Sequence, residues 1–585
     1  MPLVLTLVLA TGLRVVGLGW GLPDERHLFS YHPDEYFSLM AVWSFSLGDG
    51  DLNPHYFNYG TLYFHLVLAT AVIAGHAPFS SPAEIAQRMG ALVLDARMVT
   101  VVLGVLTVVL VYLIGKELCD RRVGLWAALV LAITPLHVVH GHYATVDVPA
   151  TFWMTLCLLC AAKILRGRGP AGAILSEAED LASGTAAEEP NARPFGAACR
   201  TASRTLRGTG QAAPYLWAGV AAGLAAATKY NGALAILFPL VAHVAVAVRG
   251  REERKLWRLI PDRRVGLCVA AMVVAFLIAC PWPLLSFGEW WGSSEQFNSV
   301  AYEVHHMRVG EEPALSATPH GLIFHLTRSL AYGCTWPLLV FMLAGVGRAL
   351  LRRGEADRVL LVFLFAWYVM IGLAKVRYMR YTIPLLPVLA LLAGSWLHEL
   401  LSSVQRRRRW AVVAVAVLCM ASVLFAAAYS ASYDRALAAE PEQDRALEAL
   451  SPHLGPYTVV GTVWPVWFCH PPLDRVNGGR ILNANPVWRH FSRPRADLRA
   501  VGYVAEPQAD IVIVTRVELR DHELAQTPQW QQISQAEREG APLELGHVLA
   551  EEAALRRFMD LEAAPQDWLY PFPGIRAFRP TSAGR

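Results

Sequence analysis

The chain has 585 residues, of which 55% are hydrophobic and only 17% are charged, and its mean hydropathy is +0.36. This composition excludes an ordinary soluble protein and predicts a polytopic membrane protein. The formal net charge of +4 is too small to indicate nucleic acid as a partner. The nine cysteines lie mostly inside apolar segments and form no CxxC pair suited to a metal and no dense disulfide framework, so we expect structural thiols.

Apolar segments recur through residues 1–430, whereas residues 431–585 have an ordinary globular composition. Segments of roughly 17–25 residues can cross a hydrocarbon core about 30 Å thick. Loops rich in Arg and Lys stay cytoplasmic, and four of them are residues 116–122, 249–264, 348–358 and 406–409. Placing these inside predicts eleven crossings of the inner (cytoplasmic) membrane, with a cytoplasmic N-terminus and an extracytoplasmic C-terminal domain. The expected spans are residues 3–21, 96–115, 123–141, 147–165, 214–229, 230–248, 265–286, 332–350, 357–374, 380–400 and 410–430.

The first outer loop, residues 22–95, contains the sequence YHPDEYFSLM at residues 31–40, with adjacent carboxylates at Asp34 and Glu35. A carboxylate that is partly removed from water gains basicity and can act as a general base. Alternatively, the two acids cap a helix beginning at Tyr36, because acids favour a helix N-terminus. Both interpretations can apply together. Later in this loop, residues 61–77 are too short for a clear span, so we expect a juxtamembrane or re-entrant helix.

Four further outer segments carry ionisable and polar side chains. In chain order, the side chains are those of His137, His140, His142, Asp147, Lys229, Tyr230, Glu303, His305, His306, Arg308, Lys375, Arg377 and Arg380. Ionisable residues are costly at membrane depth, so their gathering on one face indicates a functional site. The outer cations oppose the usual charge bias, and a bound lipid phosphate would explain them. Contact of snorkelling side chains with lipid headgroups is the alternative.

The histidines leave a metal site open. His137 and His140 are three residues apart, and a divalent ion could bind there together with Asp34 or Asp147. The alternative is a set of hydrogen-bonded interface histidines without a metal.

Two regions have a different character. Residues 167–212 are rich in Ala, Gly, Ser, Glu and Arg, which predicts a low-complexity cytoplasmic insertion. In the last part of the chain, residues 457–464 and 509–515 have strand patterns, and residues 444–450 have a helical pattern. These predict a small α/β domain that covers the site or selects the acceptor. Its aromatic stretch at residues 463–472 would stack on sugar or pack in a core.

Five motifs in chain order resemble GT-C glycosyltransferases, specifically the family 39, protein-mannosyltransferase-like and aminoarabinose-transferase-like group. They are the HPDE acid pair, NYGTLYF (58–64), DARMVTVVLGVLTVVLVYLIGKEL (95–118), HYATVDVPATFWMT (142–155) and RYTIPLLPVLALLAG (380–394). The resemblance covers residues 1–430. Its implied fold is a transmembrane GT-C module of about 11 helices, with juxtamembrane helices in the first outer loop, followed by the α/β domain at 431–585. A long outer loop at 288–330 belongs to the module.

The resemblance implies an inverting transferase that moves a sugar from a polyprenyl-phosphate donor to a hydroxyl acceptor on a protein, lipid or glycan. Asp34 would be the general base, Glu35 would orient the acceptor or contact the sugar, and Asp147 would shape the cavity. Lys229, Arg377 and Arg380 would hold the lipid phosphate. Further substrate contacts are expected from His32, Tyr59, His142, Tyr230, Glu303 and His306.

One departure from the aminoarabinose-transferase pattern concerns the phosphate-binding cation. Asn58-Tyr59-Gly60 stands where that pattern has Lys-Pro-Pro, so Arg97 is a further candidate. Two other functions stay open, namely an oligosaccharyltransferase or polymer ligase with a lipid-pyrophosphate donor, and a non-enzymatic transporter or flippase of lipid-linked sugars. The clustering of polar groups on one face favours a site at the membrane surface over a path across the bilayer.

Overall fold

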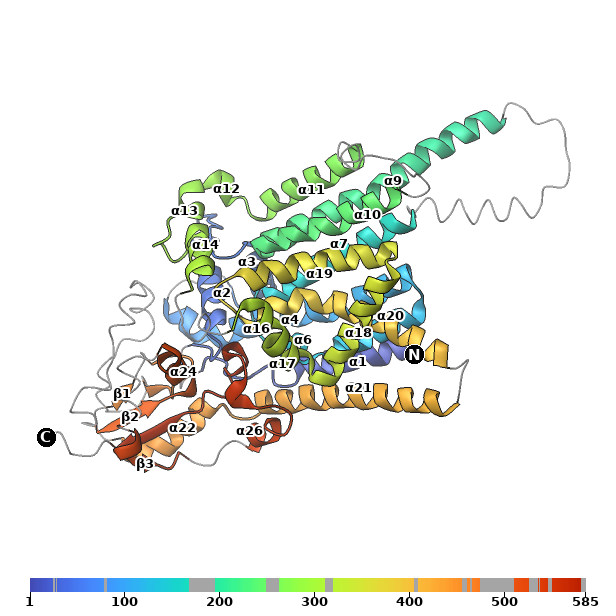
Figure 1. Ribbon diagram of the computed structural model, residues 1–585. Helices are drawn as coiled ribbons and strands as arrows, with labels where there is room; N and C mark the ends of the chain where they lie inside the picture. The colour runs from blue at the N-terminus through green and yellow to red at the C-terminus, as the bar shows by residue number, and fades with distance from the viewer. Residues whose placement is uncertain are drawn as a thin grey trace.

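A computed structural model describes most of the chain as a helical bundle that carries a small sheet at one end (Figure 1). The described residues are 1–24, 27, 29–77, 82–167, 195–248, 262–310, 319–404, 409–454, 460–462, 466–473, 510–525, 535, 537–545 and 550–579. Most of the predicted insertion lies outside them, as do most of the predicted loops at 249–264 and 406–409.

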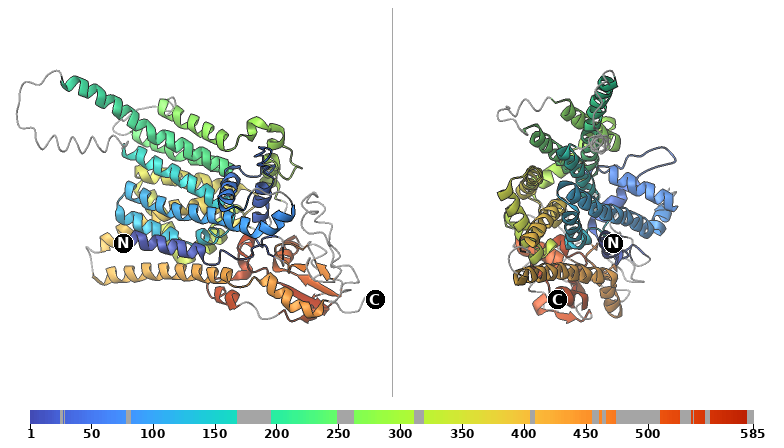
Figure 2. Two further views of the ribbon diagram at one scale, coloured as in Figure 1. Left: turned by 180° about the vertical axis from the view of Figure 1, so that it is seen from behind. Right: turned by 90° about the vertical axis from the view of Figure 1, so that its right-hand side faces the viewer.

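The bundle consists of long apolar helices that run side by side (Figure 2). Its helices are α1 (Pro2–Val15), α4 (Pro82–Leu118), α5 (Arg121–Ile133), α6 (Pro135–Val139), α7 (Asp147–Arg166), α9 (Phe195–Thr228), η1 (Tyr230–Ile236), α10 (Leu237–Ala247), α11 (Arg263–Ala279), α16 (Gly321–Phe324), η3 (His325–Leu330), α17 (Ala331–Cys334), α18 (Trp336–Arg352), α19 (Glu355–Leu373), η4 (Met379–Leu385), α20 (Leu386–Val404) and α21 (Arg409–Ala438). The predicted class, a helical membrane-type chain with a small C-terminal α/β part, is confirmed.

The number of crossings stays a prediction. Among the described residues, six helices are long and apolar enough to span a membrane, or seven if the pair 321–334 and 336–352, bent by 119°, counts as one. The predicted span 123–141 is divided into α5 and α6. Pro135 lacks a backbone N–H and disfavours helical geometry at Thr134, which explains the break.

Ion pairs connect loops and helix ends at one end of the bundle. At one end, Arg352 binds Asp357 and Glu399 at 2.5 Å each, and His398 lies 3.3 Å from Asp120. The predicted cytoplasmic loops 116–122 and 348–358 thus both contact the same helix, α20, through His398 and Glu399. The N-terminus lies at this end, and the C-terminal sheet lies at the other (Figure 1). The alternating order of the helices thus separates the two sets of loops.

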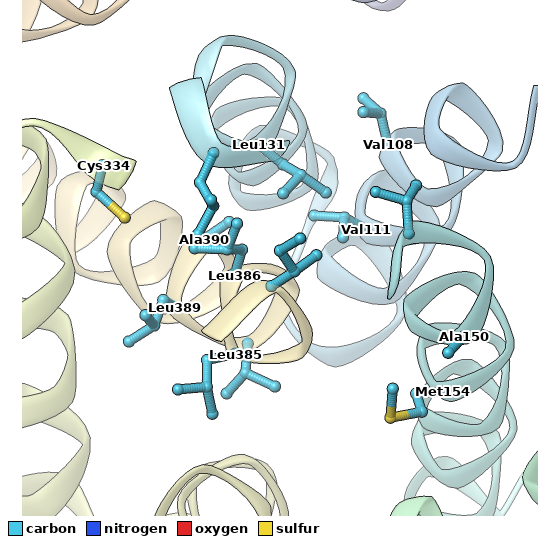
Figure 3. Packing of buried hydrophobic residues seen from close by; sticks show 14 of the residues in the cluster. Val108, Val111, Leu131, Ala150, Met154, Cys334, Leu385, Leu386, Leu389 and Ala390 are labelled. Atoms are coloured by element: carbon cyan, nitrogen blue, oxygen red, sulfur yellow. The ribbon is translucent and has the colours of Figure 1, made fainter. Parts of the chain in front are cut away.

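Close packing holds the helices together. Figure 3 shows Val111 of α4, Leu131 of α5 and Leu386 of α20 in one buried cluster. Lipid tails are also apolar, so dispersion contacts rather than loss of water contribute most in such a bundle. Gly219 and Gly223, four residues apart on α9, allow α11 to approach closely. A Cβ atom at Gly219 would lie only 2.1 Å from the carbonyl oxygen of Cys268.

The C-terminal domain is a small α/β unit. Its four strands have the order β1-β2-β4-β3, with β1 and β2 parallel and the other two pairs antiparallel. Its elements are α22 (Glu442–Leu450), η5 (Ser451–His453), β1 (Val460–Thr462), β2 (Ile511–Val514), α24 (Arg516–Ala525), β3 (Ala541–Leu543), α26 (Ala550–Leu555), η9 (Leu561–Ala563), η10 (Gln566–Trp568) and β4 (Arg576–Arg579). The strands predicted at 457–464 and 509–515 correspond to β1 and β2, although residues 455–459, 463–465 and 509 lie outside the described part.

Shorter helices surround the same end of the bundle as the sheet (Figure 1). They are α2 (Pro33–Trp43), α3 (Leu62–Ala74), α12 (Trp282–Leu285), α13 (Phe287–Trp291) and α14 (Val300–Val309). The segment predicted as a juxtamembrane or re-entrant helix is therefore helical, as α3. The first two come from the predicted outer loop 22–95 and α14 from the loop 288–330, whereas α12 lies in the last part of the predicted span 265–286 and α13 begins directly after it.

Candidate functional site at the sheet-bearing end of the bundle

The acid pair lies in the first turn of α2. This helix begins at Pro33, three residues before the predicted start at Tyr36, and Asp34 and Glu35 follow directly. Proline suits the first helical position because the N–H that it lacks would have no partner there. Both carboxylates are favoured by the helix dipole. Their further contacts separate them into two different roles.

Glu35 is completely buried in an ion pair with Arg97 of α4. Arg97 Nε donates to Glu35 Oε1 at 2.8 Å, and Nη2 donates to Oε2 at 2.7 Å. The backbone N–H of Ala144 and the hydroxyl of Ser30 also donate to this carboxylate. Such a fully paired, buried carboxylate joins α2, α4 and the loop before α7, which is a structural arrangement.

Arg97 has no donor left for a phosphate. Its Nη1 donates to the carbonyl oxygens of Leu18 and Trp20, both at 2.7 Å, and its Nη2 lies 3.4 Å from the hydroxyl of Ser30. With the two contacts to Glu35, these use all five N–H groups of the guanidinium. The side chain is 1% exposed. Its expected role as a phosphate-binding cation therefore disagrees with this geometry, and we do not retain it.

Asp34 belongs to a second, more accessible cluster. Its Oδ2 lies 3.1 Å from Nη2 of Arg380 in η4. Arg380 Nε lies 3.8 Å from Oδ2 of Asp147, the first residue of α7. Lys229, which directly follows α9, donates to Asp147 Oδ1 at 2.7 Å. The fold thus joins four predicted site residues from four separate segments in one network of ion pairs.

The acids of this cluster differ in exposure. The side chain of Asp34 is 18% exposed, compared with 5% for Asp147 and 0% for Asp567, whose Oδ2 lies 4.0 Å from Arg380 Nη1. Asp34 is therefore the carboxylate that a substrate reaches most easily. Among the described residues, Arg380 Nη1 has no hydrogen-bond acceptor. A buried donor without an acceptor is costly, and an incoming anion would satisfy it.

Aromatic rings enclose the two cations. The guanidinium carbon of Arg380 lies 3.7 Å from the centroid of the Tyr378 ring. Lys229 Nζ lies 4.9 Å from the ring of Tyr381 and 5.6 Å from that of Tyr59. Burial, together with the Asp34 and Glu303 carboxylates, raises the pKa of Tyr59 well above its usual value. These rings hold the cations in fixed positions and keep water away from them.

Three other residues predicted to contact the substrate have contacts of their own in the structure. Glu303, on α14, acts electrostatically on Tyr59, and Tyr230 accepts a hydrogen bond from Trp290 Nε1 at 3.0 Å. His306 stacks on Tyr302. Their roles toward a substrate stay predictions.

Of two further predicted residues, His142 is engaged elsewhere. The ring nitrogens of His142 lie 3.0 Å from the carbonyl oxygen of Val138 and 2.8 Å from that of Val16, so His142 ties α6 to α1. Arg377 is 7% exposed, and its charge acts on His325 of η3. The contacts of His142 do not favour direct substrate contact, whereas the phosphate-binding role of Arg377 stays a prediction.

The histidines provide no preformed metal site in the described part of the chain. There, no three His, Cys, Asp or Glu side chains are grouped closely enough to hold a metal ion. His137 Nδ1 instead lies 2.8 Å from Nη2 of Arg14. His32 is buried, with its ring 4.2 Å from the ring of Tyr143, and burial lowers the pKa of His32 well below its usual value.

The C-terminal domain contributes contacts that the sequence reasoning missed. The hydroxyl of Tyr31 donates to Asp444 Oδ1 at 2.6 Å, and the ring of His32 lies 4.9 Å from that of Tyr570. Asp567 reaches Arg380, as described above. These residues lie far from the acid motif in sequence and form no motif themselves. The only available signal was the density of Trp, Tyr and Pro at residues 565–573.

Gly60 allows the first outer loop to approach Lys229. A Cβ atom at this position would lie 2.1 Å from the carbonyl oxygen of Ala227, near the end of α9. We expect Gly60→Ala to push the loop from α9 and to lower activity at least tenfold, because it displaces Tyr59 from Lys229. Gly48→Ala is the matched control, since a Cβ there meets nothing within 4 Å. Equal activity of the two variants, measured in membranes, would contradict this explanation.

The fold and site together define a helical membrane-type protein with a charged cluster at one end of its bundle. Residues 58–173, about a fifth of the chain, match the family model described as dolichyl-phosphate-mannose-protein mannosyltransferase. This segment includes α3, α4 and Asp147, and three of the five motifs lie in it. The resemblance indicated by these motifs is thereby confirmed. No curated protein sequence matches the chain.

The comparison with solved structures gives matches at low identity. The apo oligosaccharyltransferase of Archaeoglobus fulgidus is 14% identical, with 92% of this chain and 72% of that chain covered and a TM-score of 0.48. ArnT from Cupriavidus metallidurans bound to undecaprenyl phosphate is 15% identical, with 88% and 93% covered and a TM-score of 0.48. The S. cerevisiae protein O-mannosyltransferase Pmt1-Pmt2 complex bound to the sugar donor is 14% identical, with 54% and 36% covered and a TM-score of 0.30.

Proposed function

We propose that this protein is an integral-membrane inverting glycosyltransferase that uses a polyprenyl-phosphate sugar as its donor and a hydroxyl group as its acceptor. The observation that carries this proposal is the ion-pair chain from Asp34 through Arg380 and Asp147 to Lys229. It places one accessible carboxylate beside two cations at the end of a membrane-type bundle. The match of residues 58–173 to a mannosyltransferase family supports this class of reaction.

The reaction needs a general base and a group that binds the leaving phosphate, both within reach of the anomeric carbon of the sugar. The acceptor oxygen attacks the anomeric carbon while its proton passes to Asp34. The bond from that carbon to the phosphate oxygen breaks on the opposite face, and its electron pair leaves with the polyprenyl phosphate. Arg380 and Lys229 stabilise the negative charge that develops there. Attack opposite the leaving group inverts the anomeric configuration.

Donor binding would also activate the base. Without a ligand, Arg380 pairs with Asp34 at 3.1 Å, so a cation occupies the carboxylate. A phosphate that takes over Arg380 would release Asp34 to accept a proton. We therefore expect the donor to bind before the acceptor. Asp147 would keep Lys229 and Arg380 in position throughout.

The proposed location follows from the charge pattern. The end that carries Arg348, Arg352 and the 116–122 loop would face the cytoplasm, and the site would open on the outer face of the inner membrane. The C-terminal domain, which contacts the site, would then be extracytoplasmic. Glu35 and Arg97 would hold the fold and would not touch the substrate.

Lys229→Met tests the anion-holding role. The variant loses the positive charge but keeps similar length, and Asp147 retains Arg380 as its partner at 3.8 Å. Because a hydrogen bond to a charged group contributes about 1.5–3 kcal/mol, we expect the KM for the donor to rise at least about tenfold. The KM for the acceptor should change little. Initial rates in liposomes, with donor and acceptor varied separately, measure both.

Lys375→Met is the control for this variant. Lys375 directly precedes the segment with Arg377 and Arg380 and is exposed. It should leave the donor KM unchanged. An unchanged donor KM in Lys229→Met, or the same increase in both variants, would remove Lys229 from the proposed phosphate site.

A further inference from the structure

The segment at residues 561–572 of the C-terminal domain is fixed to the helical bundle by buried polar contacts. Trp568 is fully buried; its Nε1 donates to the hydroxyl of Tyr429 at 3.0 Å, and its carbonyl oxygen accepts from the hydroxyl of Tyr433 at 2.8 Å. Both tyrosines are on α21. The residue directly before this anchor is Asp567, so its position relative to the bundle is well defined.

Asp567 holds both the backbone and the charge of Arg380. Its Oδ1 accepts from the backbone N–H of Met379, and its Oδ2 accepts from that of Arg380, each at 3.1 Å. The same Oδ2 lies 4.0 Å from Arg380 Nη1. One side chain therefore fixes the start of η4 and faces the guanidinium that pairs with Asp34.

We propose that Asp567 is a positioning residue for sugar transfer, and that it makes the C-terminal domain part of the catalytic centre by setting the reach of Arg380 toward the donor phosphate and Asp34. This inference rests on the function proposed above. It differs from a covering or acceptor-selecting role for the domain, because it concerns the donor. A loss of Asp567 should therefore affect donor kinetics before acceptor kinetics.

Asp567→Asn tests this directly in the full-length protein. The amide keeps the shape and one acceptor oxygen, but it loses the negative charge and the second acceptor. We expect kcat/KM for the donor to fall at least tenfold and the acceptor KM to stay within twofold. Asp560→Asn is the matched control, since Asp560 directly precedes this segment, is exposed, and uses its carboxylate to accept a hydrogen bond from the local backbone N–H of Glu562 at 3.0 Å. It should match the wild type.

A second measurement is independent of turnover. Polyprenyl phosphate without a sugar should raise the thermal unfolding temperature of the wild type, because a ligand that binds the folded state stabilises it. We expect this rise to be clearly smaller for Asp567→Asn and unchanged for Asp560→Asn. If Asp567→Asn does not fold, Asp567→Glu takes its place. The longer side chain should displace η4 and lower donor kcat/KM about fivefold, with the acceptor KM unchanged.

The outcomes separate this inference from the proposed function. Wild-type donor kcat/KM in Asp567→Asn, or in Asp567→Glu where that variant is used, overturns the role of Asp567. A loss that falls on the acceptor KM alone overturns it as well. Asp34→Asn is measured in parallel. If Asp34→Asn is inactive while Asp567→Asn resembles the wild type, only the positioning inference fails, whereas an active Asp34→Asn contradicts the proposed function itself.

Discussion

Replacing Asp34 by Asn is expected to abolish sugar transfer and to leave the protein folded. Asn has the same shape as Asp but cannot accept the acceptor proton, and a general base contributes a factor of about 10²–10⁴ to the rate. Arg380 keeps Asp147 and Asp567 within 4.0 Å, so the ion-pair cluster stays paired. Transfer should fall at least about a hundredfold. Rates in liposomes and thermal unfolding in detergent measure the two effects.

Asp49→Asn is the control for this variant. Asp49 lies in the same outer loop and is exposed, and it accepts a hydrogen bond from Ser46 at 2.6 Å. Its replacement should change neither rate nor stability. Transfer at more than a tenth of the wild-type rate in Asp34→Asn would show that another group takes the proton.

Glu35→Gln is expected to lower the stability of the protein strongly, in contrast to Asp34→Asn, which should lower the rate of transfer and leave the protein folded. Glu35 is completely buried and is bound by Arg97, Ala144 and Ser30. Breaking such a buried ion pair leaves an uncompensated charge and costs about 3–5 kcal/mol. We expect little folded protein in the membrane and a strongly lowered unfolding temperature. Two neighbouring acids should thus give two different defects.

A double variant separates folding from chemistry at this position. In Glu35→Gln with Arg97→Met, no unpaired charge remains, so part of the stability should return. Recovered activity in the folded double variant would agree with a structural Glu35. A stable double variant with no activity would instead assign Glu35 to catalysis. Glu289→Gln is the control, because Glu289 is 34% exposed and its ion pair with His55 should contribute little.

Local features of the sequence predicted the helical membrane class, the strands β1 and β2, and the helix α22. Apolar segments and alternation in strands are local patterns, and each can be recognised without knowing the partner segment. The eleven predicted spans differ from the observed helices, because Pro135 breaks one of them and α1 has only 14 residues. Such breaks depend on how neighbouring helices pack.

Part of the candidate site could be predicted from charge. Asp34, Asp147, Lys229 and Arg380 were each recognised because ionisable residues at membrane depth are costly, and the structure brings them together. It could not be predicted that Asp34 lies in the more accessible cluster whereas Glu35 is buried in a separate ion pair. They follow from the packing of α4, whose Arg97 reaches one acid and not the other. Asp567 could not be found either, since its partner lies 187 residues away.

The central claim is that the protein breaks a sugar–phosphate bond of a polyprenyl-phosphate donor with Asp34 as the base. It is tested most directly by the lipid product formed when purified protein in liposomes is given a labelled donor and a membrane extract as the source of acceptor. We expect release of polyprenyl monophosphate, a new glycosidic bond of inverted configuration, and neither product with Asp34→Asn. A requirement for a diphosphate-linked donor, or movement of intact lipid-linked sugar without bond cleavage, would contradict it.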